Sequence, residues 1–112
     1  MAEKTYRVLI VDDSSFMRNI LKRLIQRDGA FEIVGIAENG QQAVDMVRDL
    51  DPDVVTLDIE MPVMNGLEAL EVIMRDTPVP VLMVSSLTGA GPDATVKAME
   101  LGAIDYVPKA LD

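Results

Sequence analysis

The sequence predicts an α/β fold in which five parallel strands form one doubly wound sheet with helices on both faces. Short apolar runs rich in Val, Ile and Leu alternate with longer segments whose apolar residues recur at helical spacing. The short runs are apolar almost throughout, as expected for strands that are covered on both faces. Because strands alternate with helices, the strands are expected to be parallel and joined by right-handed crossovers.

The first half of the chain is expected to contain two strands and two helices. A strand over residues 6–11 precedes a helix that Ser14 or Asp13 can cap and that ends at Gly29. A second strand over residues 31–37 leads into Asn39-Gly40, which is also a hairpin signal. Apolar residues follow this dipeptide at helical spacing, so the sequence favours a turn into a helix.

The second half of the chain repeats the alternation after Asp51-Pro52, which ends the second helix. The expected elements are, in order, a strand through Asp58, a helix after Asn65-Gly66, a strand over Val81–Val84, a helix with Pro92 in its first turn and a strand over Ile104–Pro108. One domain, residues 1–112, accommodates the pattern, and the 49% apolar content suffices for one core.

Composition excludes several classes of function. The chain has no Cys and no His, so disulfides, the common zinc sites and Ser-His-Asp catalysis are not available within it. A net charge of −9 argues against a nucleic-acid surface. No apolar run approaches the ~20 residues of a membrane helix, and the N-terminus lacks the apolar region of a signal peptide. We therefore expect a soluble cytoplasmic domain that does not contact membranes.

Three carboxylates follow two of the predicted strands. Asp12 and Asp13 come directly after the first strand, and Asp58 lies at the end of the third. Ligands of an open parallel sheet bind beyond the carboxyl ends of its strands. If the two strands are neighbours, the three side chains share one crevice, where they repel one another unless a cation joins them. The sequence therefore predicts a cation site.

Longer motifs surround these residues. They are Val-Asp-Asp-Ser after the first strand, Leu-Asp-Ile-Glu-Met-Pro-Val-Met-Asn-Gly around Asp58, Val-Ser-Ser after the fourth strand and Gly-Ala-Ile-Asp-Tyr-Val-Pro-Lys at the end. Together they resemble the receiver domains of two-component response regulators, over essentially all 112 residues. Residues 85–89 and 101–106 are most similar to the receivers of chemotaxis protein-glutamate methylesterases. The resemblance implies a flavodoxin-like sheet with strand order 2-1-3-4-5.

The resemblance also implies a metal site and a phosphoacceptor. Asp58 matches the aspartate that accepts a phosphoryl group from a histidine kinase. Asp12 and Asp13 match the acidic pair that holds Mg²⁺ together with Asp58 and the backbone carbonyl of Glu60. Mg²⁺ prefers octahedral oxygen ligands and is usually held by few carboxylates, which agrees with this set.

Three further residues match positions with roles in this family. Lys109 is expected to place its charge on a phosphoryl oxygen, and Ser85 to donate a hydroxyl hydrogen bond to another. Tyr106 resembles the aromatic switch whose rotamer follows that bond and so signals to an output domain or partner protein. Each residue alone has an ordinary structural explanation, and it is their joint placement at strand ends that supports the prediction.

Other functions remain open at this point. The Asp58-x-Glu60 spacing also suggests a Mg²⁺-dependent phosphatase, although such enzymes usually carry a second Asp and a hydroxyl residue after the nucleophile. A pseudo-receiver that only binds partners is a third class. Gly89–Ala94 matches the dinucleotide fingerprint but follows the fourth strand instead of the first. No G-x-S-x-G elbow is present, so methylesterase chemistry is not expected in this chain, whether it is a regulatory part or a free-standing receiver.

The chain departs from the family at its end. Ala110 follows Lys109 where the family usually has a cis proline, and a cis bond before a non-proline residue costs about 2.5–4 kcal/mol, so we predict a trans peptide. The residues of a fifth helix are also absent. We therefore expect an open apolar lane over residues 8–11 and 54–57. Either the chain continues beyond Asp112, or a neighbouring molecule such as a second copy covers the lane.

Overall fold

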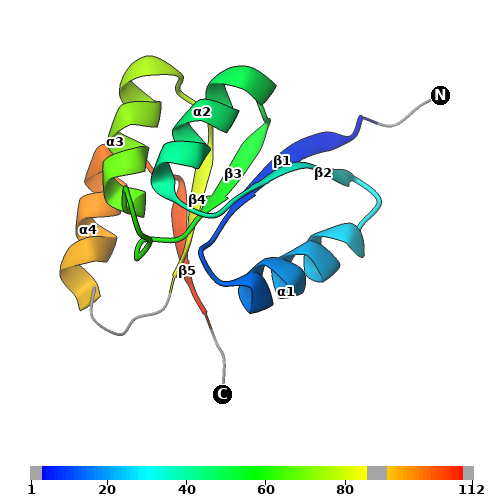
Figure 1. Ribbon diagram of the computed structural model, residues 1–112, viewed down its shortest axis with the longest axis horizontal. Coiled ribbons are helices and arrows are strands. Elements are labelled where there is room, and N and C mark those ends of the chain that lie inside the picture. The colour runs from blue at the N-terminus through cyan, green and yellow to red at the C-terminus, as the bar shows by residue number, and fades with distance from the viewer. Residues whose placement is uncertain (1–3, 86–90, 110–112) are drawn as a thin grey trace.

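The computed structural model describes residues 4–85 and 91–109, which form one sheet with helices on both of its faces (Figure 1). The elements are, in order, β1 (Tyr6–Val11), α1 (Ser15–Gln26), β2 (Phe31–Ala37), α2 (Gly40–Leu50), β3 (Val54–Leu57), α3 (Gly66–Asp76), β4 (Val81–Ser85), α4 (Gly91–Leu101) and β5 (Asp105–Pro108). The five strands are ordered β2-β1-β3-β4-β5, and every pairing is parallel. The predicted fold class and strand order are confirmed.

The predicted boundaries differ from the observed ones in a few places. β3 ends at Leu57, so Asp58 lies just beyond the strand instead of within it. β5 begins at Asp105, one residue later than expected. The prediction that Gly29 ends α1 is wrong, because Arg27 already closes the helix with its N–H donating to the carbonyls of Arg23 and Ile25.

Three of the helices that follow strands begin with a capping side chain. The Ser14 hydroxyl accepts from the Met17 N–H in the first turn of α1, and Asn39 caps α2 in the same way. Asn65 and Glu68 form a reciprocal capping box at the start of α3. Such caps typically stabilise a helix by about 1 kcal/mol each. Asn39 therefore starts a helix, and the hairpin alternative at Asn39-Gly40 is excluded.

The strands bury alternate side chains against two different layers. Leu9 and Val11 face α2, α3 and α4, which lie together on one side of the sheet (Figure 1). Val8 and Ile10 point to the other side, where α1 packs, because successive strand residues face opposite ways. The larger core lies under α2–α4 and contains Leu9, Val11, Val47, Val55, Leu57, Leu70, Ile73, Val81, Met83 and Ala98.

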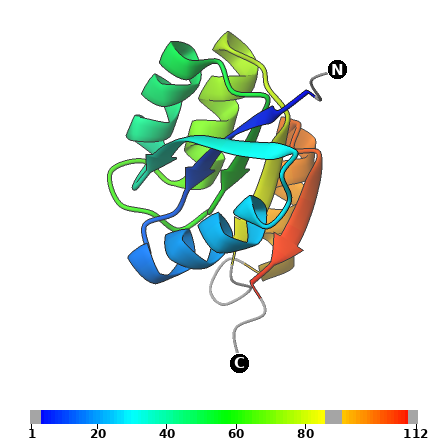
Figure 2. The ribbon, with the colours of Figure 1, turned by 90° about the vertical axis from the view of Figure 1, so that its right-hand side faces the viewer.

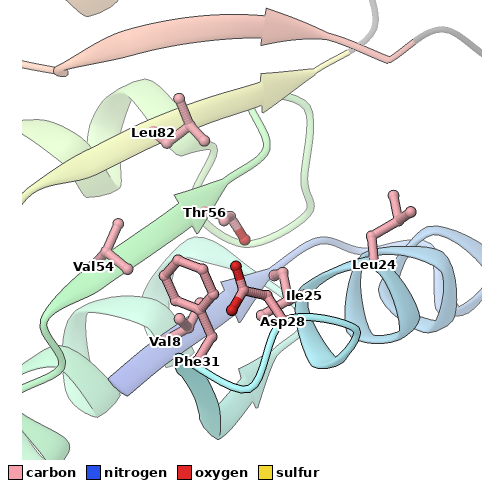
Figure 3. Close-up of a pocket in the computed structure, with 8 residues that line it drawn as sticks. All are labelled: Val8, Leu24, Ile25, Asp28, Phe31, Val54, Thr56 and Leu82. Atoms are coloured by element: carbon pink, nitrogen blue, oxygen red, sulfur yellow. The ribbon is translucent and has the colours of Figure 1, made fainter. Parts of the chain in front are cut away.

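The α1 face of the sheet contains an open apolar hollow of about 430 Å³, beside the C-terminal end of α1 (Figure 3). Its lining residues are Val8, Leu24, Ile25, Asp28, Phe31, Val54, Thr56 and Leu82. The hollow lies over β1 and β3, where the sequence predicts an open lane, and it extends to β4. The strand side chains are less exposed than that prediction implies. Val8, for example, is only 2% exposed. Figure 3 shows the Phe31 ring beside Val8. The expectation that a neighbouring molecule covers this face stays a prediction.

Some predicted features lie outside the described residues. These are the Lys109-Ala110 peptide, Ser86 and part of the Gly89–Ala94 stretch. Figure 2 shows the sheet from a second direction, with α1 on one side of it and α2 and α3 on the other. Within residues 4–85 and 91–109, no helix is both long enough and apolar enough to cross a lipid bilayer.

The close contact between the start of α3 and the end of β3 leads to a prediction about Gly66. Its N–H donates to the Ile59 carbonyl at 2.7 Å. A Cβ at this position would overlap the Asp58 carbonyl oxygen. Gly66→Ala should therefore lower the free energy of unfolding by about 1–3 kcal/mol, as measured by urea denaturation.

Gly29→Ala is the matched control, because nothing lies within 4 Å of a Cβ there. Its unfolding free energy should stay within about 0.5 kcal/mol of the wild type. Equal denaturation midpoints for Gly66→Ala and Gly29→Ala would contradict the proposed backbone contact.

Candidate functional site

The predicted site residues meet at the carboxyl ends of four adjacent strands. Backbone hydrogen bonds continue the sheet one residue beyond the strand ends. The Asp12 N–H donates to the Ala37 carbonyl at 3.1 Å, and the Asp58 N–H to the Val11 carbonyl at 3.0 Å. Between β4 and β5, the Lys109 N–H likewise donates to the Ser85 carbonyl at 3.0 Å. This extension fixes where the side chains of Asp12, Asp58 and Lys109 begin.

Three carboxylates form the acidic cluster, which we define as Asp12, Asp13 and Asp58. One oxygen from each lies within 4.8 Å of the others. Asp12 and Asp58 are buried, with 0% and 4% exposure, whereas Asp13 is exposed. The sequence prediction that these residues share one crevice is confirmed.

Lys109 lies against the buried side of the acidic cluster. Its ammonium is 2.7 Å from Asp12 Oδ2 and 3.3 Å from Asp58 Oδ2. Burial of Lys109 disfavours its charged form, but the hydrogen bond to Asp12 and the charges of Asp58 and Asp12 together raise the pKa of Lys109. One ammonium cannot neutralise three carboxylates, so an excess of negative charge remains for a further cation.

Asp58 is held by specific donors on one of its oxygens. Ser85 Oγ and the Ile59 N–H each donate to Asp58 Oδ1 at 2.8 Å. Burial is the largest effect on this carboxyl and raises the pKa of Asp58; the Asp12 charge adds to the increase, while Ser85 and Lys109 oppose it. Like-charge repulsion within the cluster thus raises the pKa of Asp58 in the same direction as burial, but burial is the larger cause.

Asp12 is held by several partners, and one of them, Arg18, is not predicted from the sequence. Asp12 Oδ1 accepts from the Ser14 N–H at 2.9 Å, and the Asp12 backbone carbonyl accepts from Arg18 Nη1 at 2.8 Å. Asp13 differs, because no hydrogen bond to its carboxylate comes from residues 4–85 or 91–109. The Arg18 contact depends on a side-chain conformation in the folded protein, and no motif or spacing signals it.

The loop between β3 and α3 is also tightly constrained. The Met64 N–H donates to the Pro62 carbonyl at 2.7 Å, which closes a γ-turn centred on Val63. Val63 has a positive φ of 70° although it is β-branched, a conformation that costs about 1–3 kcal/mol. The Gly40 N–H donates to the Met64 carbonyl at 2.8 Å and ties the turn to α2. The loop that follows Asp58 is therefore held by its own turn and by a hydrogen bond from the start of α2.

Two of the predicted site residues, Tyr106 and Glu60, form no hydrogen bond or ion pair with the acidic cluster within the described part of the chain. Tyr106 pairs with Met83 in the sheet, two residues before Ser85, and packs against the larger core. Its buried hydroxyl has no hydrogen-bond partner within the described part of the chain. Glu60 is exposed in the loop after β3. The switch role of Tyr106 and the metal role of the Glu60 carbonyl stay predictions.

The donor set of the acidic cluster fits a hard divalent cation. All three side chains offer carboxylate oxygens, the ligand type that Mg²⁺ prefers. Asp12 and Asp58 already share the Lys109 ammonium, whereas the exposed Asp13 faces the side on which a hydrated ion can enter. Mg²⁺ usually keeps several water ligands, and an exposed carboxylate leaves room for them.

This fold and this site define a receiver domain, and the comparison with protein families agrees. The family model of the response regulator receiver domain matches residues 8–112. The chain belongs to this family.

Comparison with curated proteins shows which receiver domains this chain is similar to. It is 58% identical over 103 residues to a protein-glutamate methylesterase/protein-glutamine glutaminase of Pyrococcus horikoshii, covering 92% of this chain and 28% of that protein. A protein of the same name from Geobacillus kaustophilus is 54% identical over 106 residues, covering 95% of this chain and 30% of that protein. The chain thus spans less than a third of the length of these relatives.

Solved structures show the same similarity. The response regulator domain of Thermotoga maritima CheB has a TM-score of 0.91 and 48% identity, covering 96% of this chain and 80% of that chain. A chain of the CheX–CheY–BeF₃–Mg²⁺ complex from Borrelia burgdorferi has a TM-score of 0.87 and 34% identity, covering 97% of this chain and 81% of that chain. The chain is therefore a receiver domain homologous to those of CheB methylesterases.

The raised pKa of Asp58 predicts how stability depends on pH in the metal-free protein. A carboxyl whose pKa is higher in the folded state binds more protons there, so its contribution to stability is present at low pH and is lost as pH rises through the folded pKa. Asp58→Asn removes this loss and keeps an acceptor for Ser85. The difference in unfolding free energy between Asp58→Asn and the wild type should therefore increase from pH 4 to pH 7 in the presence of EDTA.

Urea denaturation at several pH values provides the measurement. Asp45→Asn, at a partly exposed position on α2, is the control and should show a difference from the wild type that does not depend on pH in this way. A gap between Asp58→Asn and the wild type that stays constant or shrinks with increasing pH would show that the carboxyl is not destabilised by burial.

Proposed function

We propose that this domain is a phosphorylation-controlled switch in chemotaxis, which accepts a phosphoryl group on Asp58 from a histidine kinase in the presence of Mg²⁺. One observation carries the proposal. A buried carboxylate at the end of β3 lies in contact with a cluster of two more carboxylates and, at 3.3 Å, with the Lys109 ammonium. A nucleophile, a cation site and a fixed positive charge are the parts that phosphoryl transfer requires.

Asp58 performs the covalent step. Its Oδ2 attacks the phosphorus of a phosphohistidine, so that an O–P bond forms while the P–N bond breaks. The imidazole nitrogen keeps the bonding electrons of the broken bond. Because Ser85 and the Ile59 N–H hold Oδ1, the carboxylate plane is fixed before the reaction, and Oδ2 is the oxygen left for attack.

Asp12, Asp13, Asp58 and the Glu60 carbonyl hold Mg²⁺. The ion supplies positive charge that offsets repulsion between the carboxylates and the incoming phosphoryl oxygens. The chain's own donors complete this environment. Lys109 is within reach of one phosphoryl oxygen, and the Ser85 hydroxyl exchanges its bond to Asp58 for a bond to another.

Tyr106 transmits the state of the site to an output. When the Ser85 hydroxyl moves toward the phosphoryl group, the space beside it on β5 changes, and the partly buried Tyr106 ring adopts a different rotamer. The output is a further domain of the same protein, as the relatives with methylesterase names suggest, or a separate partner protein. The domain works in the cytoplasm, where histidine kinases present their phosphoryl groups.

Labelling with acetyl phosphate tests the chemistry. The wild type should gain the mass of one phosphoryl group in intact-mass spectrometry, only when Mg²⁺ is present. Asp58→Asn should abolish the gain, Asp13→Asn should increase the Mg²⁺ concentration required, and Asp45→Asn should behave like the wild type. Undiminished labelling of Asp58→Asn would exclude the assigned phosphoacceptor. Repeated rounds of phosphate release, well above one per chain, would favour the phosphatase alternative.

Mg²⁺ should also stabilise the fold, because the acidic cluster exists only in the native state. A concentration 100-fold above the dissociation constant should contribute about 2.7 kcal/mol, which corresponds to a rise of several degrees in melting temperature. The rise should be smaller in Asp13→Asn and close to that of the wild type in Asp45→Asn. A melting temperature that does not respond to millimolar Mg²⁺ in the wild type would count against a metal site.

A further inference from the structure

Arg18 connects α1 to the loop that carries the acidic pair. It lies one turn into α1, and its side chain is only 15% exposed. Arg18 Nη1 donates to the Asp12 backbone carbonyl at 2.8 Å. Arg18 Nη2 lies 3.4 Å from Glu38 Oε1, which belongs to the turn between β2 and α2. The guanidinium thus joins three segments that surround the acidic cluster.

The carbonyl that Arg18 binds belongs to the peptide bond between Asp12 and Asp13. A peptide bond is planar, so fixing its oxygen also fixes the direction of the Asp13 N–H and of the Asp13 Cα. Asp12 has further anchors in the Ser14 N–H and the Lys109 ammonium. Since Asp13 has no comparable side-chain anchor within the described residues, its carboxylate position depends on the orientation of this peptide.

The remaining contacts of Arg18 point to orientation instead of stability as its role. Glu38 is 63% exposed, and ion pairs with an exposed partner contribute little to stability. The Glu38 N–H donates to Gln42 Oε1 at 2.8 Å, so the backbone that carries the Glu38 carboxylate is itself held in place. Glu38 therefore restricts the rotation of a guanidinium whose shorter hydrogen bond is to the Asp12 carbonyl.

We propose that Arg18 is a positioning residue, which orients the Asp12–Asp13 peptide so that the Asp13 carboxylate is placed to bind the divalent cation. The inference rests on the proposed Mg²⁺ function and adds a residue outside the acidic cluster to it. Removing such a partner of a metal-ligand residue typically weakens metal affinity 10- to 100-fold.

The test uses Arg18→Met, which keeps the length of the side chain and removes its donors. Arg48→Met is the matched control, because Arg48 is an exposed arginine of α2 that pairs only with Asp45 and Asp49 among the described residues. Calorimetric titration with Mg²⁺ should show about tenfold weaker binding for Arg18→Met and unchanged binding for Arg48→Met. Arg18→Lys, which can still donate one bond to the Asp12 carbonyl, should recover part of the affinity.

A second measurement needs no metal. The Asp13 amide resonance in a ¹H–¹⁵N spectrum reports the peptide plane that Arg18 holds, because this N–H belongs to it. In EDTA the resonance should shift in Arg18→Met and stay in place in Arg48→Met. A merely structural role would lower the melting temperature without moving Mg²⁺ affinity or this resonance selectively.

The outcomes separate the inference from the proposed function. Mg²⁺ affinity of Arg18→Met within twofold of the wild type overturns the inference and leaves the proposed function standing. Absence of Mg²⁺ binding by the wild type overturns both. If Arg18→Met does not fold, Arg18→Ala, which also removes the donors, decides: a weaker affinity with a shifted Asp13 resonance supports the inference, and wild-type values of both overturn it.

Discussion

Crowding of negative charge beyond the ends of β1 and β3 is the constraint on which the rest of the site depends. Asp12 and Asp58 are buried within reach of each other, which is unfavourable unless positive charge and hydrogen-bond donors surround them. The chain supplies part of this compensation through Lys109 and Ser85. The chain does not supply enough positive charge to balance all three carboxylates of the acidic cluster. The remaining negative charge of the site therefore suits a bound divalent cation.

The parallel sheet is what makes such crowding possible. Hydrogen bonds that continue past the strand ends fix Asp12 and Asp58 side by side, and the larger core under α2–α4 keeps these strands from separating. The tight approach of Gly66 to the Asp58 backbone and the strained turn at Val63 hold the following loop. Stability from the core thus offsets the electrostatic cost of the site, as expected where a fold stores strain at its functional end.

Much of this arrangement can be predicted from the sequence because it depends on local patterns. Apolar periodicity predicts the strands and helices, and the position of Asp58 directly after a strand can be recognised in the sequence. The features that cannot be predicted from the sequence depend on side-chain conformation and packing in the folded protein. The Arg18 bond to the Asp12 carbonyl has no signal in spacing, and the raised pKa of Asp58 follows mainly from a degree of burial that only the packed structure reveals. Gly29 misleads because Arg27 already satisfies the helix end.

The acidic cluster is asymmetric. Lys109 lies on its buried side, and its exposed side is open to a further cation. Lys109 pairs with Asp12 and Asp58 on the buried side, where its long aliphatic stem brings the ammonium to the two carboxylates while the side chain is only 9% exposed. A hydrated Mg²⁺ cannot follow that path without losing its water ligands. The exposed side, where Asp13 offers a carboxylate in contact with solvent, is the side that fits a hydrated ion. In the proposed function, Lys109 and the cation would therefore both lie close to Asp58, which is the arrangement that phosphoryl transfer requires.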